Sequence, residues 1–447
     1  MFGPACRSNY VTVRIEVDDV NDVVISSVAP SGTGLTDEVG QWLVFTDGSE
    51  QATLTGANLG PSPAKIVQLE AHSGGVEVTP PSIVATYGPY APVCEVSVAN
   101  TAVTCQMKPG VGAGHAWAVS VGGTVASVSA TTRYTPPKVT AARVASHSGP
   151  GSGQLHTPGG ESIVITGESF GPAGTEAHAW YKSSSGLMFK AASCSVSVAQ
   201  TEMVCSSVAG VGHTFAWQVE VGGQRSDWFG TDMGYSAPEI AAASVVGGGT
   251  LSTKGGVVVE LQGANFGPAQ VNVVVDVAGV REATSQPAPA VVATYRSIAV
   301  SGAMFDASCT VVTDHSMVRC TTSAGAGAAL QWVVVVNTQP SSEFSSTVAY
   351  TGPTITGVLG PGPYGGSTAG GDSLRVVGSS FGPVDVSAVD FVTYGPTGAE
   401  LSAVQCRVTG NGVVDELACL TSPGTGSGHK LQLSIGGQLS EVYNHEG

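Results

Sequence analysis

Cys194-SVSVAQTEMV-Cys205 contains two short runs of alternating residues with a turn between them. Alternation with a period of two is typical of β-strands, so this stretch predicts an antiparallel pair whose end cysteines face each other. The pattern recurs as Cys94-EVSVANTAVT-Cys105, Cys309-TVVTDHSMVR-Cys320 and Cys406-RVTGNGVVDELA-Cys419. Self-similarity at a period of about 100 residues predicts tandem domains.

The paired cysteines predict disulfides rather than a metal site. A zinc site places two thiolates on one ion through C-x2-4-C spacing, which does not occur here, whereas these pairs are separated by 11, 11, 11 and 13 residues. Each bridge closes a short loop and is expected to stabilise its domain by about 2 to 3 kcal/mol. Four bridges predict an oxidising location, outside the cell or in the secretory pathway.

Two further signatures recur with each cysteine pair. Upstream lie LTGANLGPSP (54–63), ITGESFGPAG (165–174), LQGANFGPAQ (261–270) and VVGSSFGPVD (376–385). Downstream comes a Gly-rich loop and an alternating strand that carries an inward residue, namely Trp117, Trp217, Trp332 and Leu431. Many short strands with Gly-Pro turns at this rhythm predict an all-β rod of four tandem Ig-like sandwiches, with those four residues in the cores.

The repeated text resembles the IPT/TIG family of Ig-like domains, which occurs in plexin and Met-type receptors and in fibrocystin-like ectodomains. The resemblance rests on the G-x-N/S-F/L-G-P element, the Cys pair, the Gly-rich loop and a Tyr-x-x-Pro edge at Tyr134, Tyr235 and Tyr350. It implies IPT/TIG domains at 23–137, 138–238, 239–353 and 354–447. It says little about function, because the fold serves as a general spacer and recognition module.

The composition and charge of the chain limit the classes of molecule that it is expected to bind. The 447 residues carry 17 basic and 33 acidic side chains, and the formal charge of -16 repels phosphates, so nucleic acid is not an expected partner. No apolar run reaches the 18 or so residues of a membrane span. Residues 1–6 lack the features of a secretory signal, so we expect a processed chain or a fragment of a longer one.

The two ends of the chain differ from the repeats. Tyr10 to Val17 alternate cleanly, and with the acidic residues that follow they resemble the last strand and linker of a cadherin repeat, so 1–22 is expected to be an extra strand and linker. After Gly437 the fourth copy continues only with QLSEVYNHEG, which has little alternation and no Tyr-x-x-Pro edge. Its final strand is therefore expected to be incomplete.

Two explanations fit a surplus strand at one end and a missing strand at the other. The chain is a fragment of a cell-surface protein, or the surplus strand of one subunit completes the fourth sandwich of the next, which generates a filament. The donor strand would bury either Val11, Val13 and Ile15 or the opposite set that begins with Tyr10, and the apolar set is the expected one. The unpaired Cys6 would bridge subunits or pair with a cysteine in another segment.

Oxygen ligands cluster only at Asp18, Asp19, Asn21 and Asp22, where a solvated linker is favoured over a weak calcium site, and no other cofactor is expected. The Gly-rich loops are expected to be hairpin loops, and the histidines in or beside them, His115, His213 and His429, to lie on the surface. N-x-S/T sequons are absent, while Pro-Pro and Ser/Thr sites leave O-glycosylation open.

The sequence thus predicts a non-enzymatic extracellular structural protein that self-associates into a surface filament or fibril. The alternative is a fragment of a receptor or adhesion ectodomain that binds a cell-surface protein or a glycan through loops at a domain tip. No residue pattern assembles a catalytic triad or a metal set.

Overall fold

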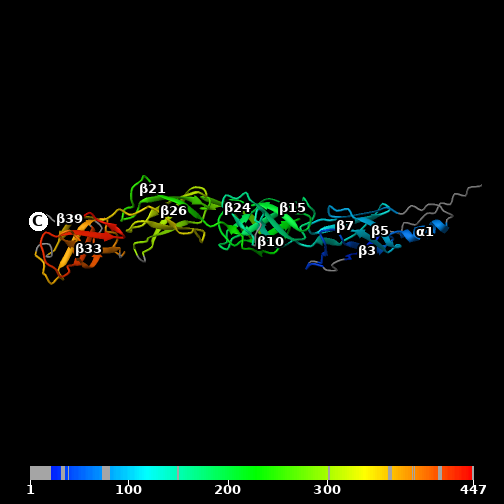
Figure 1. Ribbon diagram of the computed structural model, residues 1–447. Helices are drawn as coiled ribbons and strands as arrows, with labels where there is room; N and C mark the ends of the chain where they lie inside the picture. The colour runs from blue at the N-terminus through cyan, green and yellow to red at the C-terminus, as the bar shows by residue number, and fades with distance from the viewer. Residues whose placement is uncertain are drawn as a thin grey trace, which may run out of the picture.

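A computed structural model gives the fold, and it describes residues 22–31, 36–38, 40–72, 81–147, 151–300, 303–360, 365–384, 386, 388–410 and 415–444. The regular elements among these residues are β-strands, apart from one helix, α1 (Pro63–His72). The strands build four sandwiches, repeats 1 to 4, which lie end to end in chain order as a rod (Figure 1). The expected all-β rod of four tandem Ig-like sandwiches is confirmed.

Repeat 1 is built from two sheets. In spatial order the first contains β1 (Val24–Pro30), β3 (Gln51–Ala57), β6 (Ala102–Gln106) and β5 (Val93–Val98). The second contains β2 (Trp42–Val44), β9 (Thr131–Tyr134), β7 (His115–Val121) and β4 (Ile83–Tyr87), with β8 (Thr124–Ala126) paired to β7. Helix α1, which the sequence analysis did not anticipate, begins with Pro63, a residue suited to the first helical position. It lies near the N-terminal tip of the rod (Figure 1).

Repeat 2 has the same two-layer plan. Its first sheet contains β10 (Lys138–Val144), β12 (Ser162–Glu168), β16 (Glu202–Ser206) and β15 (Ala192–Val198). Its second sheet contains β14 (Met188–Lys190), β13 (Ala177–Lys182), β17 (Ala216–Val221) and β18 (Gln224–Arg225), with β19 (Phe229–Gly230) paired to β17. A short parallel pair, β11 (Gln154–Leu155) and β20 (Gly234–Tyr235), closes the end nearest repeat 3.

Repeat 3 joins its two layers through one long strand. The continuous sheet runs β21 (Glu239–Val245), β22 (Val258–Ala264), β27 (Met317–Thr322), β26 (Phe305–Thr313), β25 (Val291–Ser297), β28 (Leu330–Val336) and β29 (Gln339–Pro340), with β30 (Phe344–Ser345) paired to β28. A separate hairpin is formed by β23 (Gln270–Val277) and β24 (Val280–Pro287). This hairpin crosses the boundary between the repeats, because β23 contacts β14 of repeat 2 and Val274 packs with Trp180 and Met188.

Repeat 4 returns to two separate sheets. The first contains β31 (Thr354–Leu359), β32 (Ser373–Ser379), β36 (Asp415–Leu420) and β35 (Val404–Val408). The second contains β34 (Leu401–Ser402), β33 (Val389–Gly395), β37 (Lys430–Ile435) and β38 (Gln438–Leu439), with β39 (Tyr443–Asn444) paired to β37. The tail after Gly437 therefore does form two short strands, which its weak alternation did not predict.

Each core is centred on the residue that the sequence analysis placed there. Trp117, Trp217, Trp332 and Leu431 are between 0% and 4% exposed, which confirms their inward position. Across the sheet they pair with Tyr87, Tyr181, Tyr295 and Tyr394. This shared register fixes which residues of the four repeats correspond to one another.

Candidate functional site

Repeats 1 to 3 each have a pair of buried tyrosines at the end that faces the following repeat. The second tyrosine of each pair comes from the Tyr-x-x-Pro edge, and its ring is fully buried in every case. The hydroxyl groups of the partners lie 2.9, 2.9 and 2.7 Å apart in the pairs Tyr87–Tyr134, Tyr181–Tyr235 and Tyr295–Tyr350. Burial raises the pKa of all six phenols, and that of Tyr181 reaches about 12.

The backbone holds each edge tyrosine in the same way. In repeat 2 the Tyr235 N–H donates to the carbonyl of Gly212 at 2.8 Å, and the next N–H, of Ser236, donates to the carbonyl of Leu155 at 2.7 Å. Repeats 1 and 3 repeat both bonds, through the carbonyls of Gly112 and Val44 and of Gly327 and Leu251. The residues around each edge tyrosine, which we call the tyrosine segment, therefore run parallel to a short stretch of chain. The aliphatic residue of that stretch, Val44, Leu155 or Leu251, is fully buried.

The following repeat covers each tyrosine segment, and we call this contact a junction. A glutamine of the following repeat donates its Nε2 to the carbonyl of the edge tyrosine at 2.8 to 3.0 Å, in the pairs Gln224–Tyr134, Gln339–Tyr235 and Gln438–Tyr350. The glycine of each F-G-P element packs on the Gly-rich loop of the preceding repeat. A Cβ at Gly171 or Gly267 would overlap Val111 or Val211, so these glycines permit the close approach.

Polar side chains add a second contact at two junctions. Gln200 of repeat 2 bonds to Thr46 of repeat 1, through the threonine hydroxyl and through a 2.9 Å bond to its carbonyl. His315 of repeat 3 takes the corresponding position, with its Nδ1 2.9 Å from the hydroxyl of Thr157. Burial lowers the pKa of His315.

The hairpin of repeat 3 strengthens the junction with repeat 2. The Arg281 guanidinium lies 4.4 Å from the ring centroid of Trp180 and donates to Asp276 at 3.1 Å and to Gln218. Its side chain is only 7% exposed. A planar cation stacked on an indole in a desolvated site is a favourable contact.

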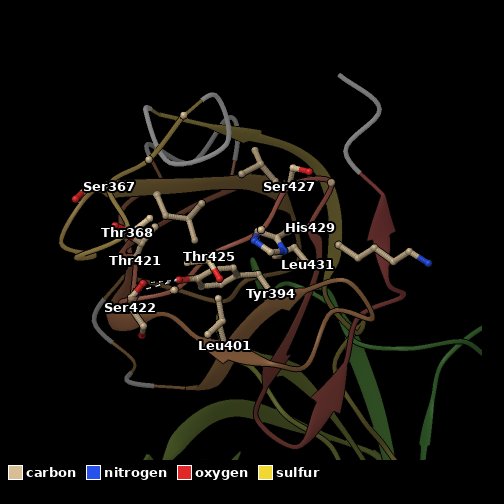
Figure 2. Close-up of a pocket in the computed structure, with 18 of the residues that line it drawn as sticks. Ser367, Thr368, Tyr394, Leu401, Thr421, Ser422, Thr425, Ser427, His429 and Leu431 are labelled. Carbon is tan, nitrogen blue, oxygen red and sulfur yellow. Dashed lines mark hydrogen bonds between the residues drawn. The ribbon is translucent and has the colours of Figure 1, made fainter.

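Repeat 4 has a pocket where the other repeats hold their edge tyrosine. The pocket measures about 520 Å³ and is lined by residues of the β33, β34 and β37 strands and of two Gly-rich loops. Figure 2 shows Tyr394, Leu401 and His429 around it. Leu401 and Leu431 stand where repeat 2 has Phe189 and Trp217, so smaller side chains enlarge the pocket further.

Several polar groups around the pocket lack a hydrogen-bond partner among the described residues, and two of them correspond to carbonyls that accept a hydrogen bond in the other repeats. Gly366 lies four residues before the positive-φ Gly370, as Leu155 does before Gly159, and Gly426 corresponds to Gly212. No described residue donates a backbone hydrogen bond to the carbonyl of Gly366 or Gly426. The buried Nδ1 of His429 likewise has no hydrogen-bond partner among the described residues. Tyr394 bonds through its hydroxyl to the backbone of Ser422 instead of to a second tyrosine.

Side chains that are covered at the junctions are exposed at this end. Thr46, Thr157 and Thr253 are at most 7% exposed, whereas the corresponding Thr368 is exposed. Thr425, which corresponds to the buried Val211 and Ala326, is also exposed. The C-terminal end of the described rod is therefore an uncovered junction surface.

The structure joins the cysteines in four disulfides, Cys94–Cys105, Cys194–Cys205, Cys309–Cys320 and Cys406–Cys419. Each links two neighbouring strands of one sheet within one repeat, such as β15 and β16. Cys6, Val11, Val13, Ile15, Asp18, Asp19 and Asn21 lie outside the described residues. Asp22 is described, and its carbonyl accepts a hydrogen bond from Asn58. In the described ranges no group of three acidic, His or Cys side chains is placed to hold a metal.

One expectation about the loops was wrong. The Gly-rich loops are not hairpin loops, because each joins a strand of one layer to a strand that does not pair with it, as from β6 to β7. The histidines are partly exposed, and each also contacts a neighbouring residue or lines the pocket. His115 packs edge-on against Tyr134, His213 lies 3.3 Å from Thr338 of repeat 3, and His429 lines the pocket.

The junction residues and the pocket were not among the residues predicted from the sequence. The signal was present, since a glutamine follows the Gly-Gly or Asn-Thr turn in repeats 2 to 4 and Gly366 breaks the pattern set by Leu155 and Leu251. These positions could not be interpreted without knowing that consecutive repeats meet there.

No protein-family model matches the chain, and the comparison with curated proteins also gives no match. Among solved structures, FdeC, an Escherichia coli adhesin, is 13% identical with a TM-score of 0.18, and the alignment covers 69% of this chain and 99% of that one. InvD of Yersinia pseudotuberculosis is 10% identical with a TM-score of 0.20, over 73% and 98%. TM-scores this low do not define a shared arrangement of repeats.

Localisation follows from the chain's own covalent structure. No described helix is long and apolar enough to cross a membrane. The four disulfides are of a kind that persists in oxidising surroundings outside the cytosol. The chain is therefore a rod of tandem Ig-like sandwiches that works outside the cell or at its surface.

Proposed function

We propose that this chain is a non-enzymatic structural subunit that joins head to tail into an extracellular filament. The N-terminal segment of one subunit would enter the open end of repeat 4 in the next subunit and complete its sandwich. A contact between two different surfaces of identical subunits does not close on itself, so it extends into a fibre. Insertion of an extended segment beside a strand is an established mode of recognition.

One observation carries the proposal: the pocket of about 520 Å³ in repeat 4 lies where repeats 1 to 3 hold a buried tyrosine segment. In those repeats the segment immediately precedes the following sandwich in the chain. In repeat 4 the corresponding position lies five residues after Asn444, outside the described residues. A segment that precedes a sandwich is therefore the kind of occupant that this pocket fits, and residues 1–22 precede repeat 1.

Other features of the proposal rest on the sequence. Cys6 lies beside the donated strand and would reinforce the contact by an intersubunit disulfide. Asp18, Asp19, Asn21 and Asp22 would form a solvated linker, with at most a weak calcium site. The Gly-Pro elements, the Cys pairs and the Gly-rich loops make an IPT/TIG type of repeat the best assignment of the four sandwiches.

Deletion of residues 1–22 tests this function. Wild-type chains imaged by negative stain are expected to form long fibres with an axial repeat of about one rod length. The truncated chain should give single rods with the same thermal unfolding. Fibres of normal length from the truncated chain would contradict the proposal.

A second function is favoured by the position of the same pocket at a tip of the rod. A receptor or adhesion ectodomain would bind a cell-surface protein or a glycan there. That function predicts isolated wild-type rods at all concentrations, whereas the filament predicts fibres whose length grows with protein concentration.

A further inference from the structure

We propose that the pocket of repeat 4 is a tyrosine site and that Tyr10 of a second copy fills it. The inference rests on the proposed head-to-tail assembly and names the side chain that it uses. It differs from the expectation that Val11, Val13 and Ile15 are the buried set.

The three filled sites of repeats 1 to 3 share one shape. In each of repeats 1 to 3 the corresponding space holds a phenol ring, which packs edge-on against ring neighbours. Tyr235 lies 6.0 Å from Phe189 and 5.5 Å from Phe215, measured between ring centroids. Its hydroxyl reaches Tyr181 and the carbonyl of Val208. In repeat 4, His429 takes the place of Phe215, and the Ser422 carbonyl takes that of Val208.

Repeat 4 has two backbone carbonyls at the positions that bind the tyrosine segment in the filled sites. The filled sites use two carbonyls, one from the Gly-rich loop and one from the parallel stretch. The corresponding carbonyls of repeat 4 are those of Gly426 and Gly366. A segment in the same register would donate the Tyr10 N–H to Gly426 and the Val11 N–H to Gly366. The strand would then run parallel to Gly365 and Gly366, as β20 runs parallel to β11.

The alternation of side chains along a strand determines which residues of the N-terminal segment can enter the pocket. Successive residues of a strand point to opposite faces, so a strand with Tyr10 in the pocket turns Val11, Val13 and Ile15 away from it. In the filled sites the residue two before the tyrosine is also covered, as with Thr132, Met233 and Val348. Ser8 would take that position.

The spacer between Tyr10 and repeat 1 is longer than the spacers that join the other repeats. In repeats 2 to 4 the first strand begins four residues after the preceding edge tyrosine, whereas β1 begins 14 residues after Tyr10. Repeat 1 also carries α1, and the junction face of its Gly60 is covered by its own Pro81. An extended spacer of 14 residues spans up to about 46 Å, which exceeds the length of about 15 Å of a ten-residue helix. The longer spacer therefore allows the segment to pass α1.

A peptide-binding experiment tests the inference. The receptor is the full chain with Tyr10→Ala, which keeps the pocket but cannot fill a neighbour's pocket with tyrosine. The probe is a fluorescent peptide of residues 7–17, and its anisotropy is measured against receptor concentration. We expect saturable binding, and a loss of at least about 30-fold in affinity when the peptide carries Tyr10→Ala.

Matched controls separate the two faces of the peptide. A peptide with Val11→Thr, Val13→Thr and Ile15→Thr keeps its β-branched residues and is expected to bind within a few-fold of the wild type. A receptor that also carries Leu401→Trp fills the pocket from its own side and is expected not to bind, while its circular dichroism stays that of a folded chain.

The outcomes are distinct. If the triple-Thr peptide loses binding and the Tyr10→Ala peptide keeps it, the apolar face is buried and the tyrosine site is wrong, but head-to-tail assembly stands. If no peptide binds and wild-type chains form no fibres, both proposals fall.

Discussion

Three glutamines at corresponding positions show how single residues shape this rod. Gln224, Gln339 and Gln438 each donate to a tyrosine carbonyl of the preceding repeat, and Gln224 is only 7% exposed. A carbonyl that loses its donor at a covered junction keeps the cost of desolvation without the hydrogen bond. These side chains therefore stabilise the contact between consecutive repeats and not the core of any one repeat.

We predict that Gln224→Leu lowers the free energy of unfolding of the junction between repeats 1 and 2 by about 1 to 3 kcal/mol. Thr124 occupies the same position in repeat 1 and is exposed, so Thr124→Ala serves as the matched control. Urea unfolding of both variants checks the prediction. Equal stability of the two variants would show that the glutamine bond contributes nothing.

At the scale of elements, the tyrosine pairs make the rod sensitive to alkali. Burial raises the pKa of these phenols in the folded chain, whereas an unfolded tyrosine ionises near pH 10. The stabilisation is thus complete below about pH 10 and is lost as the pH rises above it, by about 1.4 kcal/mol per pH unit for each such tyrosine. Urea unfolding between pH 8 and 11.5 measures this slope.

Tyr235→Phe provides the control for that slope, since it removes one ionising group from repeat 2 and leaves the ring in place. The variant should lose stability at neutral pH through its missing hydrogen bonds and show a shallower decline above pH 10. An unchanged slope would mean that the folded phenol ionises as readily as the unfolded one.

The β23–β24 hairpin should stiffen one junction more than the others. Arg281→Lys removes the planar stack on Trp180, because an ammonium cannot lie flat on the indole as a guanidinium does. We expect a wider distribution of bend angles between repeats 2 and 3 in negative-stain images. Arg296→Lys changes an exposed ion pair with Glu343 in the same repeat and should leave the distribution unchanged.

Sequence reasoning succeeded for elements with local signals. The alternation between Cys194 and Cys205 specified a strand pair, and the inward Trp217 specified a core position, because both depend on neighbours within about ten residues. It failed for α1, because the Gly-Pro turn that precedes this helix is followed by a strand in the other three repeats. It also failed for the pocket, whose lining comes from segments up to about 85 residues apart, from Val358 to Tyr443.

For the whole molecule, we predict that folding does not depend on calcium. The described residues include four disulfides and buried apolar residues in every repeat, and none of them forms an acidic, His or Cys cluster suited to a metal. Removal of calcium with a chelator should change the melting temperature by no more than about 1 to 2 °C. A large fall would place an essential ion site in the linker at Asp18, Asp19, Asn21 and Asp22.

The most direct test of the whole account is a cryo-electron microscopy structure of the native assembly at side-chain resolution. The account predicts that consecutive rods meet end to end and that the pocket of each repeat 4 holds the N-terminal segment of the next subunit, with the Tyr10 ring between Tyr394 and His429. An empty pocket, or one filled by any other segment, would contradict it.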